Sequence, residues 1–423
     1  MLGSPDGGWV YPYLYQTLQP RSIAIFAIVC ACCVVPVMVS LAEVRRRQWR
    51  VVLMWMAVGL LSQGVLRGLT AHTMEALFLG DGSNGFYQPT QQYGGLQLLR
   101  EFDRVRPALP EHPGTNMPGK LMLMYALEIV SARPAVLAWL VVALSNAGGI
   151  LLYLFVRDFL QDRDTALLSM VFYIFAPAKL LLFPVLNTVT PVFVLACAWL
   201  WMRLLHSRER QYAVALGAAA YIVVFFEPTP AVMGLLFVVL TGHALWRGDV
   251  DWRTVRTMSV TVLLAFVATY GLFVVLFGFN LAATLRTIAS HAVEFNARVN
   301  RPYGIWVGQN LLDLAFGSGV CQAVVFCAVV GLAIRQLLGG ARDIDGRLAA
   351  FCLGIAATIL ATDLAGINRG ETVRLWIFLA CFTQVPAAYA CARLDGAAPT
   401  MLVLGTTLLQ VALATSMMAF AQP

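Results

Sequence analysis

Long apolar runs, separated by short polar stretches, follow one another along most of the chain. A helix that crosses a bilayer needs about 20 apolar residues, and about twelve runs come close to that length. The predicted spans are residues 22–43, 51–69, 134–156, 165–183, 189–205, 212–226, 230–246, 257–278, 310–336, 347–365, 374–391 and 400–420. The pattern predicts an all-α polytopic membrane protein, with residues 1–423 forming a single transmembrane domain.

The composition supports this class and excludes others. Hydrophobic residues make up 60% of the chain and charged residues 12%, with a mean hydropathy of +0.75, whereas soluble domains carry about 25% charged residues. Lys and Arg in such a chain mainly set its orientation, so the net charge of +7 gives no reason to expect a nucleic-acid partner. The nine cysteines lack metal-ligand spacing, and we expect neither a metal site nor a cofactor.

The connections between the apolar runs alternate in charge. Six short connections hold 16 of the 29 Lys and Arg residues: EVRRRQWR, VRDFLQDRD, RLLHSRER, WRGDVDWRTVR, RQLLGGARDIDGR and CARLDG. Basic connections face the cytoplasm. The other connections, and both ends of the chain, are therefore predicted to face outward.

Two of the outward connections are long. Residues 70–133 form the first outer loop and residues 279–309 the second. Within the first, LQLLREFDRVRPAL (96–109) is amphipathic, and KLMLMYALEIV (120–130) is apolar but too short to span. These segments, and one in the second loop, are predicted to be helices that lie in the membrane interface.

The first outer loop begins with a lone carboxylate in a glycine-rich stretch, FLGDGSNGFYQPTQQYGG (78–95). The glycines allow the backbone near Asp81 to turn sharply and approach a ligand. Asn84, Tyr87 and Gln88 offer neutral polar groups and a flat ring, which suit a sugar. The alternative is that Asp81 only stabilises a turn through its own backbone.

Further along the same loop, the motif EHPGTNMPGK (111–120) combines two proline turns with His112 and Lys120. It resembles a stiff re-entrant turn leading into a helix. His112 is a candidate substrate contact and Lys120 a candidate phosphate ligand. The alternative is a plain turn whose lysine extends to the membrane surface.

A third candidate is GINRGETVRLW (366–376), where an outward-facing helix begins. Two guanidinium groups, on Arg369 and Arg374, at a helix start could hold a phosphate. Glu371 is a candidate substrate contact. Because Glu371 and Arg374 are three residues apart, they could equally form a structural ion pair. Arg301, in the second outer loop, is a further candidate for the phosphate.

Two weaker candidates lie elsewhere on the outer side. Glu227, in FFEPTP, is a carboxylate at the end of a predicted span, where ionisable residues are often functional. His291 and Glu294 lie on one face of the predicted helix in the second outer loop. Either group could contact substrate, or could simply be solvated.

These features together resemble the GT-C superfamily of integral-membrane glycosyltransferases. The resemblance rests on the many apolar helices, the acid near the start of a long outer loop, and HPG (112–114) followed by an amphipathic helix. Many members have His-Pro-Pro at this place, and their catalytic loop usually follows the first span rather than the second. In architecture the resemblance covers most of the chain, but in motif only residues 78–125.

The resemblance implies a function and a location. A GT-C-like enzyme would move a sugar, with inversion and without a metal, from a polyprenyl-phosphate donor to a lipid or glycan acceptor. Asp81 would be its base, with Arg369, Arg374, Lys120 and Arg301 near the phosphate. The expected location is a bacterial plasma membrane, with the active site facing the periplasm or cell exterior, among membrane lipids.

Two other classes remain open from the sequence. A lipid or glycan transporter would also have about twelve helices, but it would be expected to show paired halves and polar residues at mid-membrane. A polysaccharide polymerase or ligase of the envelope would share the outer-face chemistry. Transfer from lipid-linked monosaccharides or from lipid-linked oligosaccharides distinguishes the two enzymes.

Overall fold

The computed structural model describes residues 2–12, 20–44, 46–340 and 344–423. Ten segments in this part are helical, long and apolar enough to cross a membrane, which confirms the all-α polytopic class. They are α1 (Pro20–Glu43), α2 (Gln48–Arg67), α9 (Pro134–Leu160), α10 (Arg163–Ile174) with α11 (Pro177–Leu182), η2 (Leu186–Val189) with α12 (Thr190–Ser207), η3 (Thr229–Met233) with α14 (Gly234–Trp246), α15 (Trp252–Phe277), α18 (Val320–Leu337), α19 (Gly346–Ala365) and α23 (Ala398–Met417).

Two shorter apolar segments complete the bundle. One is α13 (Arg210–Phe226), and the other runs over Ile377–Arg393 as α21 (Ile377–Ala380) and α22 (Gln384–Arg393). The count of twelve spans stays a prediction, because these two segments are short for a bilayer.

Three predicted spans are wrong as continuous helices. One is the segment 165–183, where Phe175 and Ala176 separate α10 from α11. The segment 310–336 divides at Gly319, which lies between the end of α17 (Tyr303–Ser318) and the start of α18 and has a φ of 99°. Residues with such a φ cannot continue a right-handed helix. The segment 374–391 is also interrupted, since α20 (Thr372–Leu375) precedes the two helices α21 and α22.

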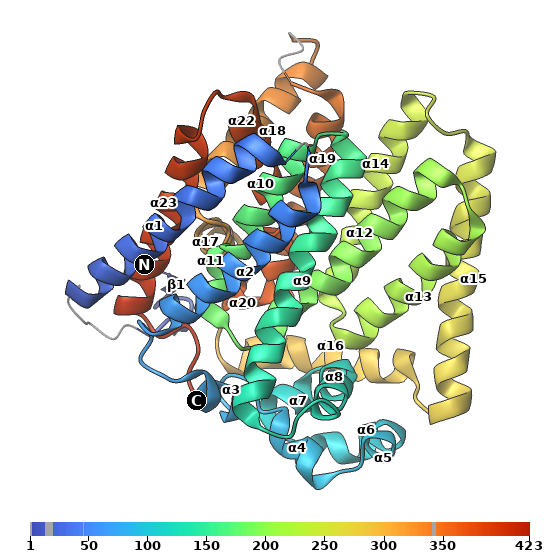
Figure 1. Ribbon diagram of the computed structural model, residues 1–423. Helices are drawn as coiled ribbons and strands as arrows, with labels where there is room; N and C mark the ends of the chain where they lie inside the picture. The colour runs from blue at the N-terminus through green and yellow to red at the C-terminus, as the bar shows by residue number, and fades with distance from the viewer. Residues whose placement is uncertain (1, 13–19, 45, 341–343) are drawn as a thin grey trace.

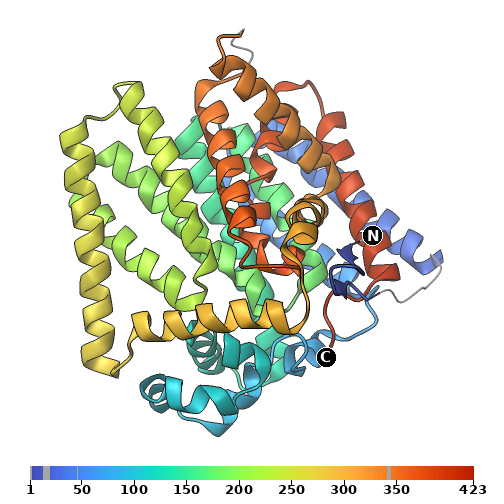
Figure 2. The same cartoon turned by 180° about the vertical axis from the view of Figure 1, so that it is seen from behind.

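The connections gather at the two ends of the bundle (Figures 1 and 2). The basic turns, such as those between α9 and α10 and between α18 and α19, lie together at one end. The first outer loop and α16 (Leu281–Arg298) lie at the opposite end. This segregation matches the charge pattern of the sequence, although which end faces the cytoplasm stays a prediction.

Cysteine labelling tests that orientation. We expect cysteines introduced at the exposed positions Gln88 and Asn300 to react with an impermeant maleimide added to intact cells, and one at the exposed Asp395 not to react. Ser83 is a poor reporter because it is only 3% exposed. The chain without an added cysteine gives the background from the native thiols. Labelling at Asp395 from outside would reverse the orientation.

The first outer loop is a layer of short helices. They are α3 (Met74–Leu79), α4 (Tyr87–Gln92), α5 (Gly95–Arg100), α6 (Phe102–Val105), η1 (Arg106–Ala108), α7 (Glu111–Thr115) and α8 (Gly119–Glu128). The predicted helix at 96–109 is thus broken at Glu101, while 120–130 and the helix of the second loop are helical as predicted. Their position in a membrane interface stays a prediction.

A separate apolar core fixes this layer onto the bundle. Buried residues of the loop, such as Phe102 and Leu121, cluster with Val141 of α9, Tyr221 of α13 and Ile288 of α16. Burying such side chains contributes about 1.5–3 kcal/mol each. The outer layer is therefore a packed part of the fold and can hold side chains in fixed positions.

The first described residues also pack at this end, which the sequence did not predict. They form a hairpin of β1 (Gly3–Ser4) and β2 (Trp9–Val10). Trp306 Nε1 donates to the carbonyl of Gly7 at 3.0 Å, and the amide of Gly3 donates to Asp313 Oδ1 at 3.1 Å. The hairpin is thereby fixed against α17.

Candidate functional site

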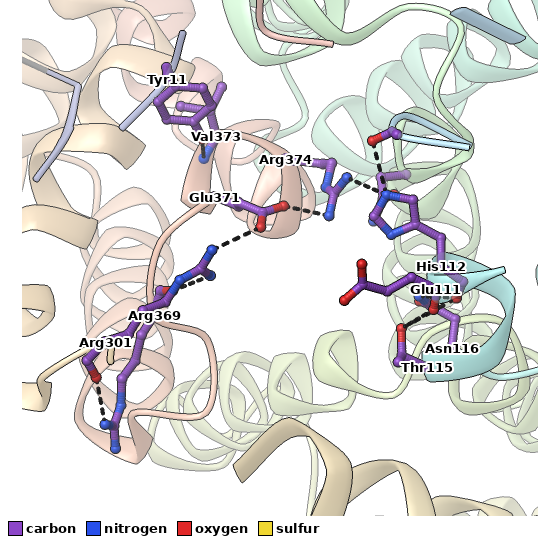
Figure 3. A network of polar contacts seen from close by, with 12 residues as sticks. Tyr11, Glu111, His112, Thr115, Asn116, Arg301, Arg369, Glu371, Val373 and Arg374 are labelled. Atoms are coloured by element: carbon purple, nitrogen blue, oxygen red, sulfur yellow. Dashed lines mark hydrogen bonds and ion pairs between the residues drawn. The ribbon is translucent and has the colours of Figure 1, made fainter. Parts of the chain in front are cut away.

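The turn before α20 carries a carboxylate held between two guanidinium groups. Glu371 Oε1 lies 3.2 Å from Arg301 Nη2, and Glu371 Oε2 lies 2.5 Å from Arg374 Nη2 (Figure 3). The three side chains are largely buried, with Arg301 only 6% exposed. Burial alone would raise the pKa of Glu371, but Arg374 and Arg301 outweigh it, so that its pKa lies below the usual range.

The turn reaches this geometry through an unusual backbone. Gly370 has a φ of 85° and Glu371 a φ of 55°, both in the left-handed region. A residue other than glycine adopts it at a cost of about 1–2 kcal/mol. The ion pairs of Glu371 supply the compensation, and the turn sets the carboxylate between its two partners.

Asn310 of α17 holds the same turn from behind. Its Nδ2 donates to the carbonyl of Asn368 at 3.0 Å, while its Oδ1 accepts from Thr372 Oγ1 at 2.7 Å and from the amide of Gly370. Tyr11 adds a contact from the hairpin, its hydroxyl accepting from the amide of Val373 at 3.1 Å. The position of Arg374 is thus set by backbone contacts from two distant segments.

The two arginines predicted to share a phosphate do not lie together. Arg369 turns away from Glu371, with Nε donating to the carbonyl of Gly366 at 2.9 Å and Nη1 to the carbonyl of Arg301 at 2.9 Å. Arg301, the further candidate from the second outer loop, lies beside Glu371 instead. The sequence around Arg369 could not indicate this arrangement, because Arg301 lies in another loop.

His112 connects this group to the first outer loop. Its Nε2 lies 3.3 Å from Arg374 Nη1 and 3.1 Å from the carbonyl oxygen of Gly82 (Figure 3). Burial, with the nearby charge of Arg374 adding to it, lowers the pKa of His112 to about 4. The imidazole is therefore neutral at pH 7 and does not add to the positive charge of the site.

The lowered pKa of His112 predicts a pH effect on stability. Between about pH 6.5 and pH 4 the unfolded chain binds a proton at this residue and the folded chain does not. The free energy of unfolding should therefore fall as pH falls through that window, by up to about 3 kcal/mol. Thermal unfolding of the purified protein should show a smaller loss between pH 7 and pH 5 in His112→Gln. An equal loss in both proteins would contradict the prediction.

Asp81 lies on the exposed side of this loop, next to the His112 turn. A side chain at Gly85 would place its Cβ 3.5 Å from Asp81 Oδ1 and 3.4 Å from Pro113 Cδ. Gly80 also permits a close approach, because a Cβ there would lie 2.3 Å from backbone atoms of Pro423. The glycines thus serve the chain's own packing, and they leave the carboxylate of Asp81 exposed to solvent.

Lys120 and Glu227 form a second, fully buried ion pair. Lys120 Nζ lies 3.2 Å from Glu227 Oε2, and the two side chains are 1% and 7% exposed. Thr190 Oγ1 donates to the same carboxylate at 2.6 Å, and Asn187 Nδ2 at 3.3 Å. Lys120 and Glu227 are therefore engaged with each other, rather than open to a phosphate and a sugar.

Removing one partner of that pair should destabilise the protein strongly. Lys120→Met leaves the Glu227 carboxylate buried and unpaired, which typically costs about 3–5 kcal/mol. We expect a clear fall in the unfolding temperature, with partial recovery in the double variant Lys120→Met/Glu227→Gln. If the double variant is no more stable than the single one, the pair is not the source of the effect.

The remaining predicted contacts lie apart from the Glu371 group. Asn84 is fully buried, with its Oδ1 accepting from the amide of Leu186 at 3.1 Å, so it ties the loop to the start of η2. The Tyr87 hydroxyl donates to the carbonyl of Ala132 at 3.1 Å. Gln88 and His291 are exposed, and neither has a described contact with Glu371.

Glu111 is a residue that sequence reasoning missed. It extends from α7 beside His112, and its Oε1 lies 3.6 Å from Arg298 Nη2 of α16 (Figure 3). Both side chains are more than half exposed, so the pair contributes little to stability. Its position directly before the HPG motif, next to His112, was the available signal.

Metal-ligating residues do not gather at this or any other place in the described chain. Groups of three or more His, Cys, Asp or Glu side chains that could hold a metal ion are absent from it. The cations nearest the site are the guanidinium groups themselves.

Comparison with known proteins leaves the site without an assigned counterpart. No protein-family model matches the chain, and no curated protein matches its sequence.

Proposed function

We propose that the protein is an integral-membrane glycosyltransferase that moves a sugar from a polyprenyl-phosphate donor to a lipid or glycan acceptor. One observation carries the proposal: His112 Nε2 contacts both Arg374 and the carbonyl of Gly82, the neighbour of Asp81. The candidate base and the paired arginines therefore lie on either side of one imidazole ring. Inverting transfer needs such a pairing of a base and a countercharge.

In this mechanism Arg374 and Arg301 bind the donor phosphate. Guanidinium groups suit phosphate because they donate parallel hydrogen bonds to its oxygens. As the bond between the anomeric carbon and the phosphate oxygen breaks, its electron pair moves to the phosphate. The two arginines stabilise this developing charge in the transition state.

Asp81 accepts the proton of the acceptor hydroxyl. The hydroxyl oxygen then forms its bond to the anomeric carbon from the face opposite the phosphate, which inverts the configuration. The carboxylate of Asp81 is exposed and so accessible to an acceptor, and general-base catalysis of this kind is worth about 10²–10⁴-fold in rate. The donor tail would lie among the apolar helices, and the reaction on the periplasmic or outer side of a bacterial plasma membrane.

Glu371 has a defined part in this proposal. Its single carboxylate pairs with both Arg301 and Arg374, which leaves the group of three with one positive charge in excess. A phosphate would compete with it for the same donors. We therefore assign Glu371 to positioning of the arginines rather than to contact with the sugar.

Reconstituted protein tests the proposal. Proteoliposomes supplied with a panel of polyprenyl-phosphate monosaccharides and with lipid acceptors should form a glycosylated product that is absent from liposomes without protein. Product formed only from lipid-linked oligosaccharides would favour the polymerase or ligase class. Movement of the lipid-linked sugar across the bilayer without transfer would overturn the enzyme assignment in favour of a transporter.

A further inference from the structure

A polar cavity lies at the end of the bundle opposite the Glu371 site, among the basic turns. Its volume is about 360 Å³, and it is shallow and widely open to the surface. It is lined by Arg157, Asp158 and Gln161 at the end of α9, Arg163 at the start of α10, and Arg203 and His206 near the end of α12. None of these residues belongs to the site around Glu371.

The lining has an excess of positive charge. Its single carboxylate, Asp158, is already paired, with Oδ1 2.8 Å from Arg157 Nε and 2.7 Å from Arg157 Nη2. Asp164 and Glu209 lie nearby but outside the lining. The lining therefore has three guanidinium groups and one carboxylate. This excess of positive charge favours the binding of an anion.

Arg203 is held in a fixed position but keeps donor capacity. Its Nη2 lies 3.2 Å from the Tyr212 hydroxyl, and its guanidinium lies 5.2 Å from the centre of the Tyr212 ring. Its Nε is buried and has no hydrogen-bond partner in the part of the chain that the structure describes. A buried donor without a partner costs about 1–3 kcal/mol unless a ligand or water satisfies it.

Exposed tryptophans place the cavity at the depth of lipid headgroups. Trp49, Trp246 and Trp252 are 46%, 80% and 66% exposed and lie at the ends of α2, α14 and α15 on the same side as the basic turns. Tryptophan is enriched at membrane–water interfaces. Trp49 packs 6.0 Å from the Tyr153 ring, over which Arg157 also lies at 5.9 Å. The cavity therefore lies next to these interfacial aromatic residues.

We propose that this cavity binds the phosphate headgroup of an anionic phospholipid, independently of the proposed transfer reaction. Arg203 donates to the phosphate oxygens, and Arg157 and Arg163 provide the surrounding positive charge. Basic pockets between the ends of spanning helices are suited to anionic headgroups. A lipid is favoured over a soluble anion because the cavity lies at the interface level, where the acyl chains can continue along the apolar faces of the helices.

The chain offers a matched control for the test. Arg247 also lies at the basic end, but it is 41% exposed and forms an isolated pair with Asp249, at 3.3 Å, outside the cavity. Arg247→Gln removes the same charge from the same end of the bundle as Arg203→Gln does. A difference between the two variants therefore reports the cavity rather than the general surface charge.

The experiment measures lipid binding to the purified full-length protein in detergent. We expect dioctanoyl phosphatidylglycerol to bind the native chain at least about tenfold more tightly than dioctanoyl phosphatidylcholine. Arg203→Gln should weaken phosphatidylglycerol binding by about tenfold, the usual effect of losing a charge-assisted hydrogen bond. Arg247→Gln should leave it unchanged, and Arg203→Lys should lie between, since it keeps the charge without the planar group.

Three results would overturn the proposal. The first is equal phosphatidylglycerol affinity in Arg203→Gln and the native chain. The second is an equal loss in Arg203→Gln and Arg247→Gln, which would indicate general surface charge. The third is inorganic phosphate binding as tightly as the lipid, which would assign the cavity to a soluble anion. If Arg203→Gln does not fold, Arg203→Lys and Arg163→Gln are compared with Arg247→Gln in its place.

Discussion

Asp81→Asn is expected to lower the kcat of sugar transfer by about 10²-fold or more while leaving donor binding intact. The substitution keeps the shape of the side chain and removes its basicity, so it separates proton transfer from binding. Asp81 is exposed beside the His112 turn and has no described ion pair, so the fold should not depend on it. The measurement is single-turnover transfer in proteoliposomes, together with donor affinity and unfolding temperature.

Glu75→Gln is the matched control for this prediction. Glu75 is an exposed carboxylate in α3 of the same loop, six positions earlier, and its loss should leave transfer unchanged. Normal transfer in Asp81→Asn, with an inactive but folded Glu227→Gln or Glu371→Gln, would place the base elsewhere. If all three variants transfer sugar normally, none of these carboxylates is the base and the assignment of the site fails.

Arg374→Gln and Arg301→Gln are each expected to reduce kcat/KM for the donor by about 10- to 100-fold. Each removes a charge-assisted hydrogen bond to the phosphate, worth about 1.5–3 kcal/mol. The structure makes a sharper distinction than the sequence did, because Arg369 donates to backbone carbonyls instead. Arg369→Gln should affect the unfolding temperature more than donor affinity.

Arg286→Gln provides the reference for non-specific charge effects. Arg286 is exposed on α16 in the same outer layer, and its removal should leave donor kinetics unchanged. A loss in Arg374→Gln could also come from the unpaired carboxylate of Glu371. The double variant Glu371→Gln/Arg374→Gln removes that charge, and it should recover stability without recovering transfer. Recovery of both would show that Arg374 only balances Glu371.

The spanning helices could be predicted from the sequence because length and apolarity are local properties. The run at 134–156, for example, corresponds to α9, which begins at the same residue and ends at Leu160. Gly319 shows the limit of that reasoning. Hydropathy does not register a backbone φ of 99°, so one continuous run conceals the break between α17 and α18.

The candidate site could be predicted in its parts but not in its pairing. His112, Glu371 and Arg374 were recognised from their own motifs, and the structure brings them together. Local motifs offer no means of choosing Arg301 over Arg369, because that choice depends on how two loops, about 70 residues apart, pack against each other. Asn310 was missed for the same reason, since its contacts are to atoms of the turn at 368–372, about 60 residues along the chain.

The contacts of His112 Nε2 with Gly82 and with Arg374 cannot both be hydrogen bonds at the same time. A single nitrogen, Nε2, faces a carbonyl oxygen on one side and a guanidinium donor on the other, and it can carry a proton toward the first or accept one from the second, but not both. An anion that binds Arg374 therefore leaves His112 Nε2 free to carry the proton, and to donate a hydrogen bond to the carbonyl of Gly82 beside Asp81. Binding of an anion at Arg374 and ordering of the loop around Asp81 should then increase together.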